Sequence, residues 1–323
     1  MSAFAFKPAD SYRERAGLFV SLTGGTNSGK TFSALRLARG IAGANGKVAV
    51  VDTEGGRTLH LKEHFAFDVV LMDPPFRPDR FSAAAIAAEE AGYDALVIDS
   101  FSMEWVGLGG VLEWQSQELL RMAGDDYKKQ ERMKMASWIK PKTAHKAMVY
   151  SLLQRRIPII FSIRGEETVK PGAPGEKPST VFKSITNSQF PYEVTVSFRL
   201  ASDRKGYIDL SDPKSWKMEG AHQAIFRDGD RISEEHGAKL AAWARGEGIG
   251  PDQQPAPPGR RDEPRLFVVA REKAEQLGSI GLRDWIQACK PVQQEALRAI
   301  KVDLDAIAGR TDLAMVEDEE VPA

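Results

Sequence analysis

The sequence predicts an α/β fold in which a mainly parallel sheet lies between helices, followed by a small helical module. Two observations lead to this expectation. Up to about residue 245, short and almost wholly apolar runs alternate with stretches of helical periodicity, as in parallel strands covered on both faces. After a stretch rich in proline and glycine, the remaining apolar residues recur only at helical spacing.

The strands of the expected sheet are the apolar runs 17–24, 47–56, 67–75, 93–100 and 156–164. Helices are expected between and after them, at 30–43, 79–92, over most of 102–156, and at 233–246. Gly43 is placed to end the first helix and Ser233 to cap the last one. A late pair of strands within 192–211 predicts an antiparallel extension at one edge. The glycines and prolines of 165–183 predict a mobile loop.

The chain is expected to divide into a main domain and a smaller C-terminal module. The predicted segments are a lead-in at 1–16, the α/β domain at 17–246, a flexible linker at 247–264, a three-helix module at 265–312 and an acidic, disordered tail at 313–323. The three amphipathic helices of the module favour binding to a partner protein or self-association over catalysis.

The composition excludes some classes of function. The formal net charge is −1, so any contact with nucleic acid must come from a local basic patch. Cys289 is the only cysteine, which excludes an intrachain disulfide and argues against a cysteine metal site. No signal peptide is recognisable, and no run reaches the roughly 20 apolar residues of a membrane span. We therefore expect a cytoplasmic protein that does not enter a membrane.

A glycine-rich segment between the first strand and the first helix predicts a phosphate-binding loop. It fits G-x-x-x-x-G-K-[ST] with Gly24, Gly25, Thr26, Asn27, Ser28, Gly29, Lys30 and Thr31. Phosphate oxygens need several backbone N–H donors at once, and glycines leave them accessible. Lys30 supplies a positive charge for the β- and γ-phosphates, and Thr31 a hydroxyl for Mg²⁺. The alternative is a glycine turn that merely precedes a lysine, but the strand and helix around it favour a site for ATP and Mg²⁺.

Two acids at strand ends complete the predicted site. Asp99 ends an apolar strand and is expected to hold Mg²⁺ through water; otherwise it only marks the end of a strand. Glu54 follows the strand after the phosphate loop, where a carboxylate can act as general base toward water; otherwise it is a solvated loop acid. Asp52 lies two residues earlier and is interpreted as structural.

The segments GGTNSGKT, VVDTEGG and ALVIDS together resemble the RecA-like P-loop ATPases. The chain length and the segment WIKPKTAHKAMVYSLLQRRIPIIFSIRGEE are most similar to phage-encoded AAA-type ATP-binding proteins that assist single-strand annealing and recombination. The resemblance covers roughly residues 17–245 and implies a RecA-like P-loop NTPase core in a bacterial host's cytoplasm. It also implies that Glu54 and Lys30 are catalytic and that Thr31 and Asp99 hold Mg²⁺.

The same resemblance implies further roles. Such ATPases carry a polar sensor residue, usually glutamine, where this chain has Ser162 and Arg164. Their ATP site often lies at an interface between identical subunits, with a basic residue supplied by the neighbour. The candidates for a trans or sensor role are Arg155, Arg156 and Arg164. Residues 165–185 would correspond to a DNA-binding loop, with Lys170, Lys177 and Lys183.

A basic stretch offers a second candidate surface for DNA. Residues 121–156 contain ten lysines and arginines against three acids, an asymmetry that suits a phosphate backbone. Tyr127 and Trp138 lie among them and are suited to stacking on bases. A solvated helical face is the alternative. The candidate contacts are Lys128, Lys129, Arg132, Lys134, Lys140, Lys142 and Lys146.

The sequence thus predicts a Mg²⁺-dependent ATPase that acts on single-stranded DNA in recombination, repair or replication. It is expected to form homo-oligomers and to bind an annealing or replication protein through the C-terminal helices. Two alternatives stay open. One is an ATP-dependent DNA-binding loader or annealing scaffold with little turnover, and the other is a P-loop kinase of small molecules.

Overall fold

The computed structural model describes residues 17–170, 179–247 and 265–319. The chain divides into two compact units, Met1–Gln254 and Pro255–Ala323. Among the described helices, none is long and apolar enough to cross a membrane. The expected lead-in at 1–16 and most of the expected linker lie outside the described residues.

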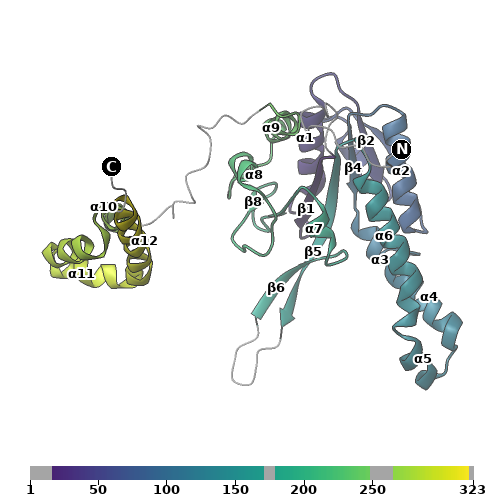
Figure 1. Cartoon of the computed structure of the whole chain (residues 1–323). Coiled ribbons are helices and arrows are strands. Elements are labelled where there is room, and N and C mark those ends of the chain that lie inside the picture. The colour runs from purple at the N-terminus through teal and green to yellow at the C-terminus, as the bar shows by residue number, and fades with distance from the viewer. Residues whose placement is uncertain (1–16, 171–178, 248–264, 320–323) are drawn as a thin grey trace, which may run out of the picture. The chain divides into compact units, whose positions relative to one another are not determined.

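The first unit is built on an eight-stranded sheet in the order β3-β2-β4-β5-β1-β7-β8, with β6 paired to β5 (Figure 1). Its strands are β1 (Phe19–Gly24), β2 (Val48–Asp52), β3 (Asp68–Leu71), β4 (Ala95–Asp99), β5 (Ile159–Lys170), β6 (Ser179–Ser184), β7 (Val196–Leu200) and β8 (Ile208–Asp209). The pairs β5–β6 and β7–β8 are antiparallel, and the other pairings are parallel. The predicted α/β class with a mainly parallel sheet is confirmed.

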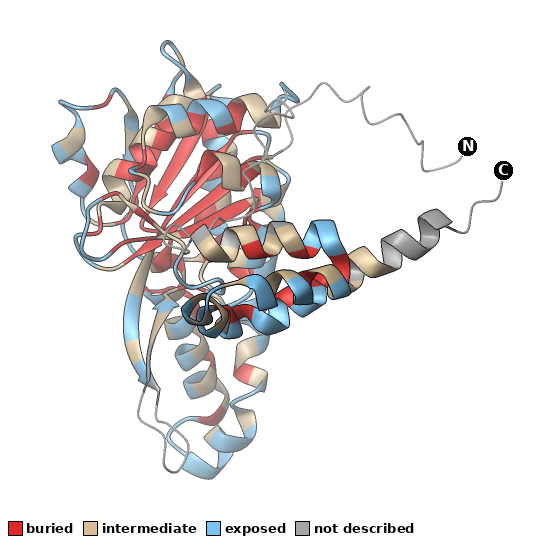
Figure 2. Cartoon of the chain, turned by 90° about the vertical axis from the view of Figure 1, so that its left-hand side faces the viewer, coloured by how far each residue is buried: buried red, intermediate tan, exposed pale blue. Residues whose placement is uncertain are grey.

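Helices cover both faces of this sheet, as the burial pattern shows (Figure 2). They are α1 (Lys30–Ala42), α2 (Pro78–Glu90), α3 (Ser102–Val106), α4 (Val111–Ala123), α5 (Tyr127–Met133), α6 (Ile139–Leu153), α7 (Phe190–Glu193), α8 (Gly220–Ile225) and α9 (Glu234–Ala244), with short 3₁₀ turns η2 (Arg57–Leu61) and η3 (Ala136–Trp138). Helices α1 and α9 share a core with one face of the sheet, and α2 and α6 share a core with the other.

The two cores explain why the central strands of the sheet are mainly apolar. Successive side chains of a strand point to opposite faces, so Val20 and Leu22 enter the core under α1, whereas Phe19 enters the core under α2. Each of the three is at most 5% exposed. Buried polar residues within these strands are few, as at Ser21 and Ser162, and the predicted functional side chains lie at or just beyond the ends of the strands.

Helices α1 and α9 touch backbone to backbone at a glycine. A Cβ atom built on Gly40 would lie 1.9 Å from the carbonyl oxygen of Glu234, so no larger residue fits there. As predicted, α1 ends at Gly43, and Ser233 is the N-cap of α9. This close contact fixes α1, and with it the loop at its N-terminus.

The expected mobile loop at 165–183 is wrong over most of its length. Strand β5 continues to Lys170, and β6 returns antiparallel to it, with Gly165 opposite Ser184. The resulting β5–β6 hairpin contains β-branched and aromatic residues that favour strands. Its glycines and prolines are confined mainly to 171–178, outside the described residues. A smaller correction concerns β7, which starts only at Val196 because Phe190–Glu193 form α7.

The second unit is helical, with α10 (Arg265–Ala288), α11 (Pro291–Leu297), η5 (Arg298–Ile300) and α12 (Lys301–Glu319). Two of the expected helices join as α10 across a non-helical Gly278. A core that includes Leu282, Leu297 and Leu304 holds these helices together. Residues 313–319, expected to begin a disordered tail, are helical, so that expectation is wrong for them.

Candidate nucleotide-binding site

The predicted phosphate loop joins the end of β1 to the start of α1. Thr26 and Asn27 at its tip are exposed. The ammonium group of Lys30 donates hydrogen bonds to the carbonyl oxygens of Gly24, at 2.8 Å, and Gly25, at 2.7 Å. A Cβ atom on Gly25 would meet nothing within 4 Å, so the loop is open on that side. Burial lowers the pKa of Lys30, while the negative charges of Asp99 and Glu54 oppose this effect.

Gly29, the residue before α1, is required by both its backbone and its surroundings. Its φ of 84° lies in the left-handed region, and a Cβ atom there would lie 2.9 Å from the amide nitrogen of Gly206. That amide donates a hydrogen bond of 2.8 Å to the carbonyl oxygen of Ser28. The turn before β8 therefore supports the phosphate loop from outside.

We expect Gly29→Ala to destabilise the loop, by about 1–2 kcal/mol from the backbone conformation alone. The clash with Gly206 adds to this cost. Thermal unfolding should show a lower melting temperature and weaker stabilisation by added ATP. Gly25→Ala is the matched control, because its Cβ atom meets no neighbour and the melting temperature should stay close to that of the wild type. Equal melting temperatures for the two variants would contradict this account.

The hydroxyl of Thr31 donates a hydrogen bond of 2.6 Å to Oδ2 of Asp99. Thr31 lies in the first turn of α1 and Asp99 at the end of β4, and β5 separates β4 from β1, the strand that leads into α1. In the register of the sheet Asp99 pairs with Ser162, and Gly24 pairs with Arg164. Burial raises the pKa of the Asp99 carboxyl group, and the hydrogen bond from Thr31 opposes this effect. A cation beside Thr31 would favour the ionised form of Asp99.

Asp52 holds the loop that carries Glu54. Its Oδ1 accepts hydrogen bonds from the amides of Glu54, at 2.7 Å, and Gly56, at 3.2 Å. Its Oδ2 accepts bonds from the amide and hydroxyl of Thr58, at 2.8 and 2.6 Å. Burial alone would raise the pKa of Asp52, but these hydrogen bonds outweigh burial and lower it. The contacts agree with the structural interpretation of Asp52.

A second set of bonds joins the ends of β2 and β4. The amide of Thr53 donates to the carbonyl oxygen of Asp99 at 2.9 Å. The hydroxyl of Thr53 donates to the carbonyl oxygen of Ser100 and accepts from the amide of Ser100. These contacts fix the backbone at Glu54 relative to that at Asp99.

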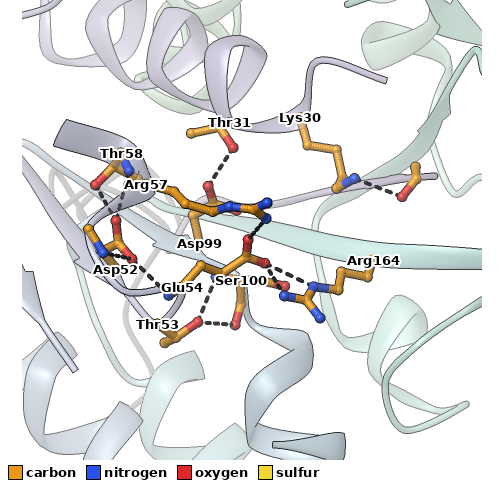
Figure 3. A network of polar contacts seen from close by, with 12 residues as sticks. Lys30, Thr31, Asp52, Thr53, Glu54, Arg57, Thr58, Asp99, Ser100 and Arg164 are labelled. Carbon is orange, nitrogen blue, oxygen red and sulfur yellow. Dashed lines mark hydrogen bonds and ion pairs between the residues drawn. The ribbon is translucent and has the colours of Figure 1, made fainter. Parts of the chain in front are cut away.

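The carboxylate of Glu54 lies between two arginines (Figure 3). Arg57 donates to Oε2 at 2.6 Å, and Arg164 donates to Oε1 through Nε and Nη2, at 2.9 and 2.6 Å. The side chain of Glu54 is only 14% exposed. Burial would raise its pKa, but the two guanidinium groups outweigh burial and lower it.

Most residues of the predicted site lie close together at the carboxyl ends of the strands (Figure 3). They are Lys30, Thr31, Glu54, Asp99 and Arg164. The roles assigned to them stay predictions. Arg57 was not predicted as part of the site. Its signal in the sequence was weak: an arginine three residues after the proposed base, in a short loop with two glycines.

Arg155 and Arg156 do not lie in this site. They precede β5, and its first residue, Ile159, pairs with Phe19 at the amino end of β1, so they are at the opposite end of the sheet. Arg155 forms an ion pair of 2.8 Å with Glu89, and the amide of Arg156 also donates to that carboxylate. A sensor role within their own chain is therefore wrong, and a role toward a second copy stays a prediction.

All residues of the predicted basic patch are exposed. They are Lys128, Lys129, Arg132, Lys134, Lys140, Lys142 and Lys146. The patch lies on α5, on α6 and in the segment between them. Tyr127 is 73% exposed. Trp138 is half-buried, stacks on Trp105, and lies 5.0 Å from the ammonium group of Lys142, so Tyr127 is the more accessible aromatic residue. In the hairpin, Lys183 is exposed, whereas the Lys170 side chain and Lys177 are outside the described residues.

The donor atoms at the site fit the predicted ligands. Mg²⁺ prefers oxygen donors, and Thr31 and Asp99 present a hydroxyl and a carboxylate in contact with each other. A triphosphate needs backbone N–H groups and a cation at the start of a helix, and the loop with Lys30 supplies both. The structure therefore places a glycine-rich loop, a lysine, a hydroxyl and two carboxylates at one end of a mainly parallel α/β sheet.

No family model matches this chain, and no curated protein matches it either. Twenty-six chains of solved structures do match it. One of them is the crystal structure of a KaiC-like protein from the hyperthermophilic archaeon Pyrococcus horikoshii, with 15% identity and a TM-score of 0.24 over 62% of this chain and 88% of that chain. At this TM-score the likeness carries no argument.

Proposed function

We propose that this chain is a Mg²⁺-dependent ATPase that acts on single-stranded DNA in recombination, repair or replication. The observation that supports the ATPase is the convergence of Lys30, Thr31, Glu54 and Asp99 at the carboxyl ends of the strands. The first two come from the loop and helix that suit a triphosphate. The other two are carboxylates at the carboxyl ends of neighbouring strands, Asp99 as the last residue of β4 and Glu54 two residues after β2.

In this proposal each side chain has a separate task. Lys30 neutralises charge on the β- and γ-phosphates, and the N-terminus of α1 adds its free N–H groups. Thr31 and Asp99 would hold Mg²⁺, which would supply neutralising charge to the phosphates. Glu54 takes a proton from a water molecule as the water oxygen attacks the γ-phosphorus and the bond to the bridging oxygen breaks. General bases of this kind contribute about 10²–10⁴-fold in rate.

The proposal that DNA is involved rests on the basic patch and on the resemblance to annealing and recombination ATPases. The arm formed by α4 and α5 extends from the same end of the sheet as the β5–β6 hairpin (Figure 1). Single-stranded DNA bound to the basic patch would therefore lie at the same end of the sheet as the proposed ATP site. The finer assignment, to a phage-encoded AAA-type protein of single-strand annealing, rests on the same resemblance.

Two kinds of protein partner are also proposed. One is a second copy of the chain, which would supply a basic residue to the ATP site. The other is an annealing or replication protein bound by the C-terminal helical unit. That unit has its own core and exposes Ile280, Val292 and Val302, each at least 77% exposed.

The experiment that tests the proposed function is an ATPase assay with and without single-stranded DNA at two salt concentrations. Turnover that DNA stimulates, more strongly at low salt, is the expected result, because phosphate contacts weaken steeply with salt. ATP-dependent DNA binding without turnover would favour the loader or annealing scaffold. Phosphate transfer to an added nucleoside monophosphate would favour the kinase.

Reversing charge in the basic patch should weaken DNA binding. For Lys128→Glu with Lys129→Glu, we expect the salt dependence of the affinity for single-stranded DNA to become shallower, by about 0.7 in log–log slope for each phosphate that is no longer neutralised. Fluorescence anisotropy at several salt concentrations measures this slope. Lys62→Glu with Lys214→Glu changes the same charge at exposed positions outside the patch and should keep the slope. If Lys183→Glu reduces the slope and the double variant of the patch does not, DNA binds the β5–β6 hairpin instead.

A further inference from the structure

The surroundings of Glu54 conflict with its proposed task. A carboxylate has about four acceptor positions. Two guanidinium N–H groups of Arg164 share Oε1, and one of Arg57 occupies Oε2. At most one position is left for a water molecule. Charge-assisted hydrogen bonds of this kind are roughly twice as strong as neutral ones, so the arrangement holds the carboxylate in place and weakens it as a base.

We propose that Arg57 and Arg164 form a clamp that restrains Glu54, and that ATP hydrolysis becomes fast only when the clamp opens. This inference rests on the proposed function, because it assigns Glu54 the part of general base. Arg57 and Arg164 are positioning residues in it, since they act on the reaction through Glu54.

The position of Arg164 connects the clamp to the β5–β6 hairpin. Arg164 is at the base of the β5–β6 hairpin, where its amide donates a hydrogen bond of 2.9 Å to the hydroxyl of Ser102. Its carbonyl oxygen accepts a 2.7 Å bond from the amide of Ile185, just after β6. The next residue, Gly165, lies against the ring of Phe182 on β6, as a Cβ atom there would be 2.1 Å from that ring. A ligand that moves the hairpin would thereby move Arg164 relative to Glu54.

Every charged group around Glu54 acts on its titration. Arg57 and Arg164 contact it directly, and the charges of Lys30 and Asp99 lie close enough to interact with it. The charge of Asp52, the last residue of β2, acts on Arg57 in turn. A base works only when it is deprotonated, so turnover falls as the pH drops through the pKa of Glu54. The clamp lowers this pKa, and removing one arginine raises it.

The test uses the full-length chain with Arg57→Gln, because the Arg57 side chain is 72% exposed and its loss leaves both cores intact. We expect ATP turnover without DNA to rise severalfold, and the acidic limb of the pH–rate profile to move to higher pH. Arg57→Lys keeps the charge and should restore most of the restraint. Arg283→Gln, an exposed arginine of the helical unit, is the matched control and should change neither quantity.

A second measurement needs no turnover. In protein labelled with ¹³C-glutamate, the Glu54 carboxyl signal, assigned with Glu54→Gln, should titrate at a higher pH in Arg57→Gln than in the wild type. An unchanged titration, or turnover that stays equal or falls in Arg57→Gln, would overturn the clamp. A wild-type protein that does not hydrolyse ATP would overturn the proposed function, and the titration would still decide whether Arg57 holds Glu54.

Discussion

Glu54→Gln is expected to reduce ATP turnover by about 10²–10⁴-fold, the usual contribution of a general base. The amide has nearly the same size as the carboxylate, but it cannot take a proton from water. ATP affinity should stay close to that of the wild type, because phosphate binding is assigned to the loop and Lys30. Single-turnover hydrolysis and equilibrium binding of a fluorescent ATP analogue measure the two effects separately.

The matched control for this substitution is Glu63→Gln, at an exposed position outside the site. It removes the same charge and should hydrolyse ATP at the wild-type rate. Melting temperatures of both variants guard against a general loss of structure. Normal turnover by Glu54→Gln would show that Glu54 is not the base and would remove the chemical step from the proposed mechanism.

Lys30→Ala should have the second large effect, a loss of ATP affinity. A hydrogen bond to a charged group contributes about 1.5–3 kcal/mol, which corresponds to roughly 10- to 100-fold in the dissociation constant. The same substitution removes the bonds from Lys30 to Gly24 and Gly25, so the loop also loses a support. Isothermal titration with ATP measures the affinity. Unchanged affinity in a folded Lys30→Ala protein would place the nucleotide elsewhere.

Lys30→Arg serves as the companion variant. It keeps a positive charge but replaces a compact ammonium by a planar guanidinium. It should therefore recover part of the affinity and little of the turnover. Full recovery of both would mean that charge alone, without the geometry of the loop, is sufficient at this position.

Local pattern was enough to predict the strands of the parallel sheet, the glycine-rich loop before α1 and the position of Asp99 at the end of a strand. Each depends on residues close in sequence, such as the apolar run that makes β4 and the acid that ends it. The hairpin was missed for a related reason. The composition of 165–183 is dominated by the glycines and prolines near its centre, which hide the strand-forming residues Val169, Val181 and Phe182 on either side.

The surroundings of Glu54 could not be predicted in the same way. Arg164 is 110 residues away in the chain, and only the insertion of β5 next to β4 brings it to that carboxylate. Arg57 is close to Glu54 in sequence, but the direction of its side chain depends on the hydrogen bonds by which Asp52 holds the loop from residue 53 to residue 58. Neither contact leaves a periodic pattern. Conversely, Arg155 and Arg156 are candidates that the resemblance implies, and they lie at the end of β5 away from the site of their own chain; a role toward a second copy stays a prediction.

The strand order has a consequence for how the protein is made. The segments that carry the phosphate loop and Asp99 leave the ribosome first, but β1 and β4 do not pair with each other; β5 lies between them. Synthesis proceeds at about 5–20 residues per second, so the nascent chain exposes these apolar strands for some seconds before residues 159–163 emerge. A chaperone that shields them during that interval would act before any nucleotide could bind.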